Sequence, residues 1–299
     1  MRVLILFLCS LVLTACTPKL DPQMMAIQKE QRTFWKWNDQ QIHYVEKGEG
    51  TRNVVLVHGF SSDTSTWNDL MNRLVDSGHH VWAIDLLGFG WSDKPLDAKY
   101  GIDLYLDQIV SFLEAKGIAK ADFVGHSMGG GLVLGMAVYH PEYVERLVVL
   151  DPLAYPLDLP FSFLVVKHCP GLIKPFCGPT FIKMARQQLV YKDSTACSPE
   201  RIDQASMPFM MPNGPDAAFT VLGKFDKQVL TDLSSRIPEI KIPTLIIWGK
   251  EDPLIPVAHC ENFRRDIPQG QQFILGECGH LPHEEHPEAV ENSIIDFLK

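Results

Sequence analysis

Gly125-His126-Ser127-Met128-Gly129 is the stretch that decides the fold of this chain. An apolar run that contains Phe123 and Val124 precedes it, and a helical pattern of small residues follows it. This context predicts a nucleophile elbow, in which a serine sits on a strained turn between a strand and a helix. The flanking glycines let neighbouring backbones pass closely. A bare G-x-S-x-G also occurs in ordinary glycine-rich turns, so the interpretation depends on motifs elsewhere in the chain.

A second apolar run, Val54-Val55-Leu56-Val57, ends in His58-Gly59-Phe60 upstream of the serine. When a hydroxyl attacks a carbonyl, the carbonyl oxygen becomes an anion, and two backbone N–H groups aimed at it stabilise it. We expect the amides of Phe60 and Met128 to form this oxyanion hole. The alternative is a plain strand-to-loop turn with a structural His58.

Two further apolar runs end in polar loops, one that reaches Asp252 and one that reaches His280. Parallel strands place such loops along one edge of a sheet, so both side chains can converge on Ser127. Serine is a weak nucleophile at neutral pH, and an imidazole must take its proton while a carboxylate orients the ring. The sequence therefore predicts a catalytic triad of Ser127, Asp252 and His280.

Two more motifs extend this pattern. The first is Asp85-Leu86-Leu87-Gly88-Phe89-Gly90-Trp91-Ser92, and the second is Gly279-His280 followed by Glu285, Pro287 and Glu288. Together with the chain order Ser, Asp, His, they resemble the α/β-hydrolase superfamily from about residue 41 to the C-terminus. Within it, the chain looks similar to capped esterases and monoacylglycerol-lipase-like members.

This resemblance also bears on the acid and on the reaction. Some members carry the acid after the sixth strand, where this chain has Asp151. Asp252 is preferred, with Asp151 and Glu251 as alternatives. Haloalkane dehalogenases and epoxide hydrolases of the superfamily use an aspartate nucleophile, so Ser127 implies acyl-enzyme chemistry instead.

The wider pattern predicts an α/β fold with a mainly parallel, doubly wound sheet, because apolar runs alternate with helical patterns. Strands are expected near 42–46, 53–58, 80–85, 121–126, 145–150, 244–249 and 271–275, and helices near 66–76, 103–116, 128–140, 257–266 and 287–298. The core would comprise residues 41–151 and 241–299. Between 152 and 240 the alternation stops, which predicts a helical cap inserted after the sixth strand. Its aromatic and methionine side chains suit apolar or aromatic substrate groups.

The N-terminus reads as a targeting segment. Residues 1–15 combine a basic start, a short apolar run and the ending Leu13-Thr14-Ala15-Cys16, which resembles a bacterial lipobox. Such a run is too short to span a bilayer and is typical of a secretory signal. We expect lipidation of Cys16, a tether over 16–40 that leads into the core, and anchoring in the bacterial cell envelope, at an outer membrane facing the periplasm. An ordinary signal peptide with a coincidental cysteine is the alternative.

Export would leave five cysteines in a compartment that permits disulfides. The favoured pairs are Cys260 with Cys278, on the same sheet edge, and Cys169 with Cys177 inside the cap. Cys197 would then stay unpaired. The alternative is that all five are buried thiols, and sequence alone does not settle the connectivity.

Composition narrows the function. A formal net charge of −9 argues against a nucleic-acid surface. His283 and His286 follow His280 without a matching ligand set, so we expect no metal, and the triad needs no cofactor. The expected activity is hydrolysis of small carboxylic esters with an apolar acyl or aromatic part. The alternatives are carbon–carbon bond hydrolysis of diketone-type substrates and an inactive hydrolase-fold binding protein of the envelope. The oligomeric state stays open.

Overall fold

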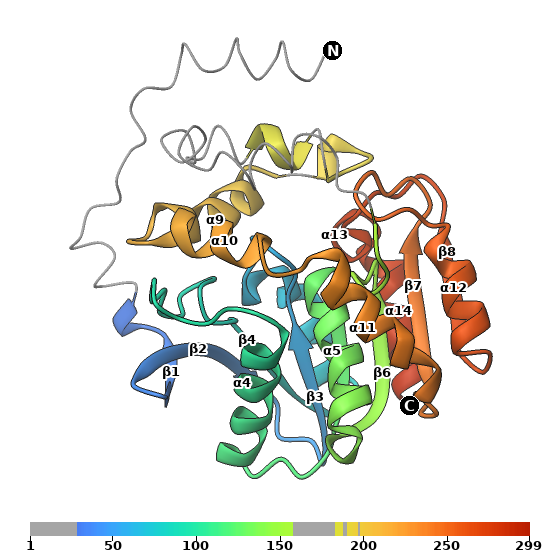
Figure 1. Cartoon of the computed structure of the whole chain (residues 1–299), viewed down its shortest axis with the longest axis horizontal. Helices are drawn as coiled ribbons and strands as arrows, with labels where there is room; N and C mark the ends of the chain where they lie inside the picture. Colours follow the sequence, from blue (N-terminus) through green and yellow to red (C-terminus); the bar gives the residue numbers. More distant parts are fainter. Residues whose placement is uncertain (1–28, 158–182, 188–189, 197) are drawn as a thin grey trace.

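The structure is a computed structural model that describes residues 29–157, 183–187, 190–196 and 198–299. Several predictions lie outside these residues, namely those on the signal peptide 1–15, Cys16, Cys169, Cys177 and Cys197. The described chain is built on an eight-stranded sheet with the order β1-β2-β4-β3-β5-β6-β7-β8 (Figure 1).

The sheet confirms the predicted α/β fold. The β1/β2 and β2/β4 pairs are antiparallel, and every other pair is parallel. The inner strands β5 and β7 are buried along their whole length, as apolar runs covered on both faces require. The strands are β1 (Thr33–Trp37), β2 (Gln40–Lys47), β3 (Arg52–Val57), β4 (His79–Ile84), β5 (Ala121–His126), β6 (Val144–Leu150), β7 (Thr244–Gly249) and β8 (Gln271–Leu275).

The edge strand β1 was not among the expected strands, because its residues were assigned to the tether. A two-residue turn with positive φ at Asn38 (46°) and Asp39 (63°) returns the chain from β1 into β2, which is the geometry of a tight hairpin. Trp35 packs edge-on against Phe112 with ring centroids 5.6 Å apart. The sheet therefore begins earlier in the chain than the apolar pattern indicated.

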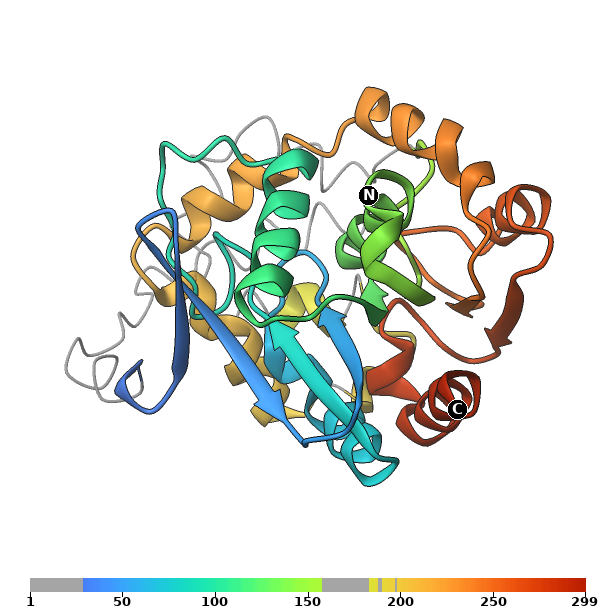
Figure 2. The same cartoon turned by 90° about the horizontal axis from the view of Figure 1, so that it is seen from below.

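Helices cover both faces of the sheet, and Figure 2 shows the strands between the two helix layers. Leu106, Leu132 and Phe263 pack in the core on one face, and Leu70 and Val290 pack in the core on the other. The first layer contains α4 (Ile102–Ala115), α5 (Met128–Tyr139) and α12 (His259–Asp266), and the second contains α3 (Asn68–Asp76) and α14 (Pro287–Leu298). None of the helices in the described ranges is long and apolar enough to cross a bilayer.

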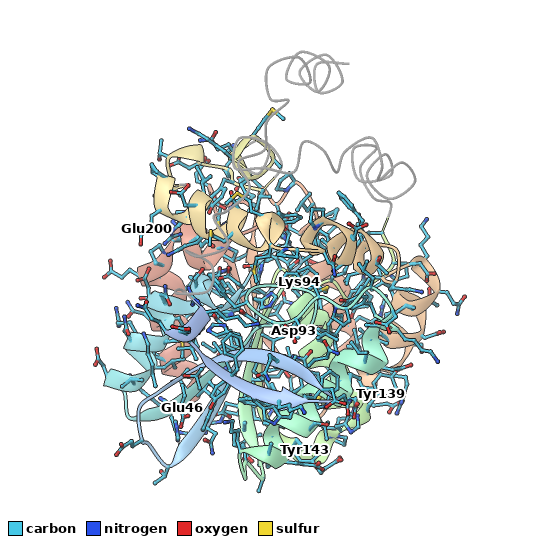
Figure 3. The ribbon with its side chains drawn as sticks, turned by 90° about the vertical axis from the view of Figure 1, so that its left-hand side faces the viewer. Glu46, Asp93, Lys94, Tyr139, Tyr143 and Glu200 are labelled. Atoms are coloured by element: carbon cyan, nitrogen blue, oxygen red, sulfur yellow. The ribbon has the colours of Figure 1, made fainter. Side chains whose placement is uncertain are left out.

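Within residues 198–243, the structure places α9 (Pro199–Met210), α10 (Gly214–Leu222) and α11 (Lys227–Arg236) in succession with no strand between them. Figure 1 shows α9 and α10 beyond the carboxyl end of β3. The Asn213 amide between them donates to the Lys94 carbonyl at 3.2 Å, and Lys94 lies between this layer and the strands (Figure 3). The Lys94 ammonium in turn donates to the carbonyls of Gly90 and Ser92 at 2.7 and 2.8 Å. These contacts join the helices to the loop that follows β4.

That loop encloses the buried side chain of Asp85. The Asp85 carboxylate accepts hydrogen bonds from Thr64 N and Trp91 N, and it pairs with His43 Nδ1, each at 2.7 Å. Burial alone would raise the pKa of Asp85, but His43, His58 and the Trp91 amide together outweigh it and the pKa falls to about 2. A Cβ at Gly90 would lie only 2.0 Å from this carboxylate. In this structure the Asp85–Ser92 motif therefore fixes the conformation of a loop.

The favoured disulfide between Cys260 and Cys278 is wrong, because both are free, buried thiols. Cys260 on α12 packs in the core on one face of the sheet, whereas Cys278 packs in the core on the opposite face. A shared sheet edge does not bring the two thiols together, because the sheet itself lies between them. Burial, reinforced by nearby carboxylates, raises the pKa of both thiols, that of Cys260 to about 12.

Candidate active site

Ser127 lies in a strained turn between β5 and α5. Its φ of 52° and ψ of −118° are unusual for a residue other than glycine. Hydrogen bonds on both sides hold this geometry. Ser127 N donates to Leu150 O at 2.9 Å, and Ser127 O accepts from Gly131 N at 3.0 Å and from Leu153 N at 2.9 Å. The turn is thus tied to β6 as well as to its own helix.

The two glycines of the motif are required by close backbone contacts. A Cβ at Gly125 would lie 2.5 Å from Gly129 O, and a Cβ at Gly129 would lie 2.3 Å from Val57 O. Real Cβ atoms do not approach backbone so closely. Only glycine at both positions lets α5 start directly over the ends of β3 and β5.

The three predicted triad side chains meet at this turn. His280 Nδ1 lies 2.6 Å from Asp252 Oδ2, and His280 Nε2 lies 2.9 Å from Ser127 Oγ. Because a carboxylate only accepts hydrogen bonds, the neutral ring carries its proton on Nδ1 and its lone pair on Nε2. The Ser127 hydroxyl therefore donates to His280, which is the arrangement needed to deprotonate it.

The structure pairs His280 with Asp252 and with neither alternative acid. Asp252 Oδ1 also accepts from Leu254 N at 2.7 Å and from Ile255 N at 3.0 Å, so its side chain is fixed on both oxygens. The Glu251 carboxylate instead accepts from Cys278 N at 3.0 Å. Asp151 lies next to Asp252, but it makes no hydrogen bond to the His280 ring in this arrangement.

The predicted oxyanion segments flank the nucleophile. A Cβ at Gly59 would lie 3.1 Å from Ser127 Cβ, so the loop that carries Phe60 passes directly beside the serine. The Phe60 ring packs edge-on against Phe89, with centroids 5.6 Å apart. Met128 begins α5, where backbone N–H groups have no partner within the helix. Both backbone segments are therefore next to the reacting hydroxyl.

One compact group in the described part of the chain has the composition of a metal site. Asp151, Asp252 and His280 each offer an atom within 4.8 Å of the others. His280 Nδ1 and Asp252 Oδ2 already bind one another, so this geometry is also that of a proton relay. The other candidate histidines make ordinary contacts. His283 Nε2 lies 2.8 Å from Thr66 Oγ1, and His286 Nε2 donates to Glu277 O at 3.1 Å.

His126 supports the site as a hydrogen-bonding residue, as its place beside the nucleophile predicts, through a partner that the sequence does not indicate. Its Nε2 donates to the His280 carbonyl at 2.7 Å, and its ring lies 4.8 Å from the His280 ring. Burial, followed by the nearby His280 and His283, lowers the pKa of His126 well below its usual value. His126 is thus a neutral donor that ties the strand of the nucleophile to the loop of the base.

Glu284 is a second residue that no motif indicated. It belongs to α13 (Pro282–Glu285), which follows the base, and its carboxylate is bound by Arg186, Tyr191 and Thr66. The Arg201 guanidinium lies 3.3 Å from the same carboxylate. Arg186 and Arg201 both come from the chain between β6 and β7, and their distance in sequence from Glu284 hides the connection.

The fold and the hydrogen-bonded Ser–His–Asp chain together define a protein of the α/β hydrolase class. Comparison with family models gives the narrower identity. Residues 54–292 match the alpha/beta hydrolase family, and the chain belongs to it.

The proteins that are similar to this chain are named as hydrolases. A 2-hydroxymuconate semialdehyde hydrolase of Pseudomonas sp. strain CF600 is 28% identical over 258 residues, which cover 82% of this chain and 86% of the relative. A protein of the same name from Pseudomonas putida is 30% identical over 228 residues, which cover 73% of this chain and 76% of the relative. Among solved structures, the meta-cleavage product hydrolase CumD of Pseudomonas fluorescens IP01 superposes with a TM-score of 0.78 at 23% identity, covering 89% of this chain and 97% of that one. These relatives are meta-cleavage product hydrolases and related enzymes, so the expected likeness to monoacylglycerol lipases is wrong.

Proposed function

We propose that this protein is a serine hydrolase that breaks a carbon–carbon bond next to a carbonyl group in a small acidic substrate of the ring-cleavage-product type. The single observation that carries the hydrolase chemistry is the continuous chain from Ser127 Oγ through His280 to Asp252, with contacts of 2.9 and 2.6 Å. The bond class rests on the relatives. The semialdehyde in their name contains no ester, so its hydrolysis must break a carbon–carbon bond.

The chemistry follows from the geometry. Ser127 Oγ attacks the carbonyl carbon while its proton passes to His280 Nε2, and Asp252 stabilises the imidazolium that forms. The amides of Phe60 and Met128 bind the oxyanion. When the tetrahedral intermediate collapses, the electron pair of the broken bond goes to the leaving carbon, where a conjugated second carbonyl accepts it as an enolate. The proton on His280 then goes to this leaving group.

Water completes the reaction. It attacks the acyl group on Ser127, gives a proton to His280, and releases a carboxylic acid as the serine regains its hydrogen. The net change is one water consumed, with its hydroxyl on the acid and its hydrogen on the leaving fragment. In this proposal, residues 152–240 form the cap over the site and supply the substrate pocket.

Ester hydrolysis is the second candidate, and the lipobox-like Leu13-Thr14-Ala15-Cys16 favours it. Lipidation of Cys16 would place the enzyme at a membrane, where ester substrates with apolar acyl groups are plentiful. An alkoxide leaving group needs only the proton from His280 and no second carbonyl. The triad serves both reactions, so the substrate has to decide between them.

A direct comparison of substrates tests this proposal. Wild type and Ser127→Ala are assayed on a 2-hydroxy-6-oxo-dienoate, followed by loss of its visible absorbance, and on p-nitrophenyl esters of increasing chain length. We expect the larger kcat/KM on the dienoate, and a loss on the order of 10⁶ in Ser127→Ala. Preference for an ester would favour the second candidate. A fluorophosphonate that labels Ser127→Ala as well as wild type would contradict the nucleophile itself.

We also propose that Cys16 is lipidated and anchors the mature protein to the bacterial envelope, because the residues before it have the signal pattern described above. Stable anchoring requires more than one acyl chain. Expression of the full chain in a Gram-negative host with labelled palmitate tests this. We expect label in the membrane fraction of wild type and none in Cys16→Ser. Equal fractionation of both proteins would rule out the anchor.

A further inference from the structure

Asp151 is a buried carboxyl beside the triad that the reaction steps above do not use. It follows β6 directly, and its φ of 43° lies in the left-handed region. Asp151 N donates to Ile247 O at 3.0 Å, and Asp151 Oδ1 accepts from Gly249 N at 2.9 Å. A strained conformation in a fully buried residue persists only where neighbouring contacts fix it. The side chain is therefore held in one place.

The hydrogen bonds to the two neighbouring carboxyls are unequal. Asp252 accepts from Leu254 N, Ile255 N and His280 Nδ1. Within the part of the chain that the structure describes, Asp151 accepts only from Gly249 N, and its buried Oδ2 meets no donor. Atoms of both carboxyls and of His280 lie within 4.8 Å of one another. Two buried carboxylates at this distance cannot both ionise easily, and the proton resides on the one with fewer donors.

The surroundings favour the same distribution of charge. Burial, and then the negative charge of Asp252, raise the pKa of Asp151 well above its usual value, and Glu285 acts in the same direction. The thiols of Cys260 and Cys278 are also close, and their pKa values are raised by burial and by these carboxylates. They stay neutral, so they do not relieve the repulsion.

We propose that Asp151 is a positioning residue of the triad. At neutral pH it carries a proton on Oδ2, donates this O–H to the Asp252 carboxylate, and so holds Asp252 against His280. This inference rests on the proposed serine hydrolase chemistry. It gives Asp151 a different role from that of an alternative acid, because the residue supports Asp252 and does not replace it.

A donor to Asp252 has a measurable consequence. The Asp151 O–H partly neutralises the charge of Asp252, so without it Asp252 is less well oriented and its full negative charge stabilises the imidazolium form of His280. His280 is then protonated, and so unable to accept the proton of Ser127, up to a higher pH. Loss of the Asp151 donor is therefore expected to shift the acidic limb of the kcat/KM profile to higher pH and to lower the plateau.

Two matched variants separate this role from a structural one. Asp151→Asn keeps an acceptor for Gly249 N and a donor for Asp252, whereas Asp151→Gly removes both. Both residue types tolerate positive φ. We expect Asp151→Gly to lose about tenfold to a hundredfold in kcat/KM with its acidic limb at higher pH, and Asp151→Asn to recover most of that loss with the limb unmoved. If Asp151 were ionised, Asp151→Asn would remove a charge and move the limb to lower pH, which would overturn the proposal.

An infrared measurement tests the protonation without relying on turnover. At pH 7, wild type and Ser127→Ala are expected to show the C=O stretch of a protonated carboxylic acid that Asp151→Asn lacks. Thermal melting confirms that each variant is folded. Identical spectra of wild type and Asp151→Asn would overturn the proposal. If even wild type turned over no substrate, the proposed function would fail, while the infrared band would still decide the state of Asp151.

Discussion

At the residue scale, unusual backbone conformations mark one edge of the sheet. Seven of the described residues other than glycine have positive φ, and four of them, Ser61, Ser127, Asp151 and Glu277, lie shortly after a parallel strand. Such conformations are costly and tend to gather at functional sites. The turns carry or flank the nucleophile, the oxyanion loop and the base. The strain thus lies where the reacting groups must be aimed, away from the regular strands that support them.

His126 offers a test at this scale, because its one hydrogen bond links the nucleophile strand to the base loop. We expect His126→Phe to lower kcat by about tenfold to a hundredfold with little change in KM, since a small misplacement of His280 is costly in a triad. His126→Gln keeps an N–H donor and should retain more activity. Steady-state kinetics of both variants, alongside their melting temperatures, provide the measurement. Equal kcat values for the two would show that the hydrogen bond does not position the base.

At the scale of elements, short loops bring the base and the chain between β6 and β7 together. His280 N donates to Val190 O at 2.8 Å, and the Glu285 carboxylate accepts from Lys192 N at 2.9 Å and from Gly279 N at 2.9 Å. Glu284 adds its contacts with Arg186 and Arg201. The loop that carries the base is therefore fixed by the same chain segment that we propose as the cap. Substrate contacts in that segment and the position of His280 should be coupled.

The sequence allowed the parallel strands and the triad to be predicted, for a physical reason. Strands buried on both faces must be apolar throughout, and the elbow needs glycine at two fixed positions, so both leave local patterns. The edge strand β1 (Thr33–Trp37) has only one buried residue and a mixed pattern, which hid it. Contacts such as that of Glu284 with Arg186 join distant residues with no periodic spacing. The bond that is cleaved depends on pocket side chains, which the motifs do not specify.

At the scale of the whole molecule, buried ionisable groups set how stability depends on pH. Burial lowers the pKa of His283 from 6.5 to about 4. For Glu284, burial alone would raise the pKa, but Arg186, His283, Tyr191 and Arg201 together outweigh it and the pKa falls from 4.5 to about 2. In the unfolded chain both groups regain their ordinary values. The unfolded state therefore binds more protons than the native state below about pH 6.5, and acid favours unfolding.

The two groups act in successive pH windows, which gives a prediction for denaturation experiments. The contribution of His283 is complete above about pH 6.5 and is lost as the pH falls towards 4, because only the unfolded histidine is protonated there. That of Glu284 is complete above about pH 4.5 and is lost as the pH falls towards 2. We expect the unfolding free energy from urea titrations to drop by about 2–3 kcal/mol between pH 7.5 and pH 4.5 through His283 alone. In His283→Gln this drop should shrink, while a loss below pH 4.5 persists because Arg186 still lowers the pKa of Glu284. A His283→Gln variant with the full wild-type drop above pH 4.5 would show that the other buried histidines, and not His283, carry the acid sensitivity.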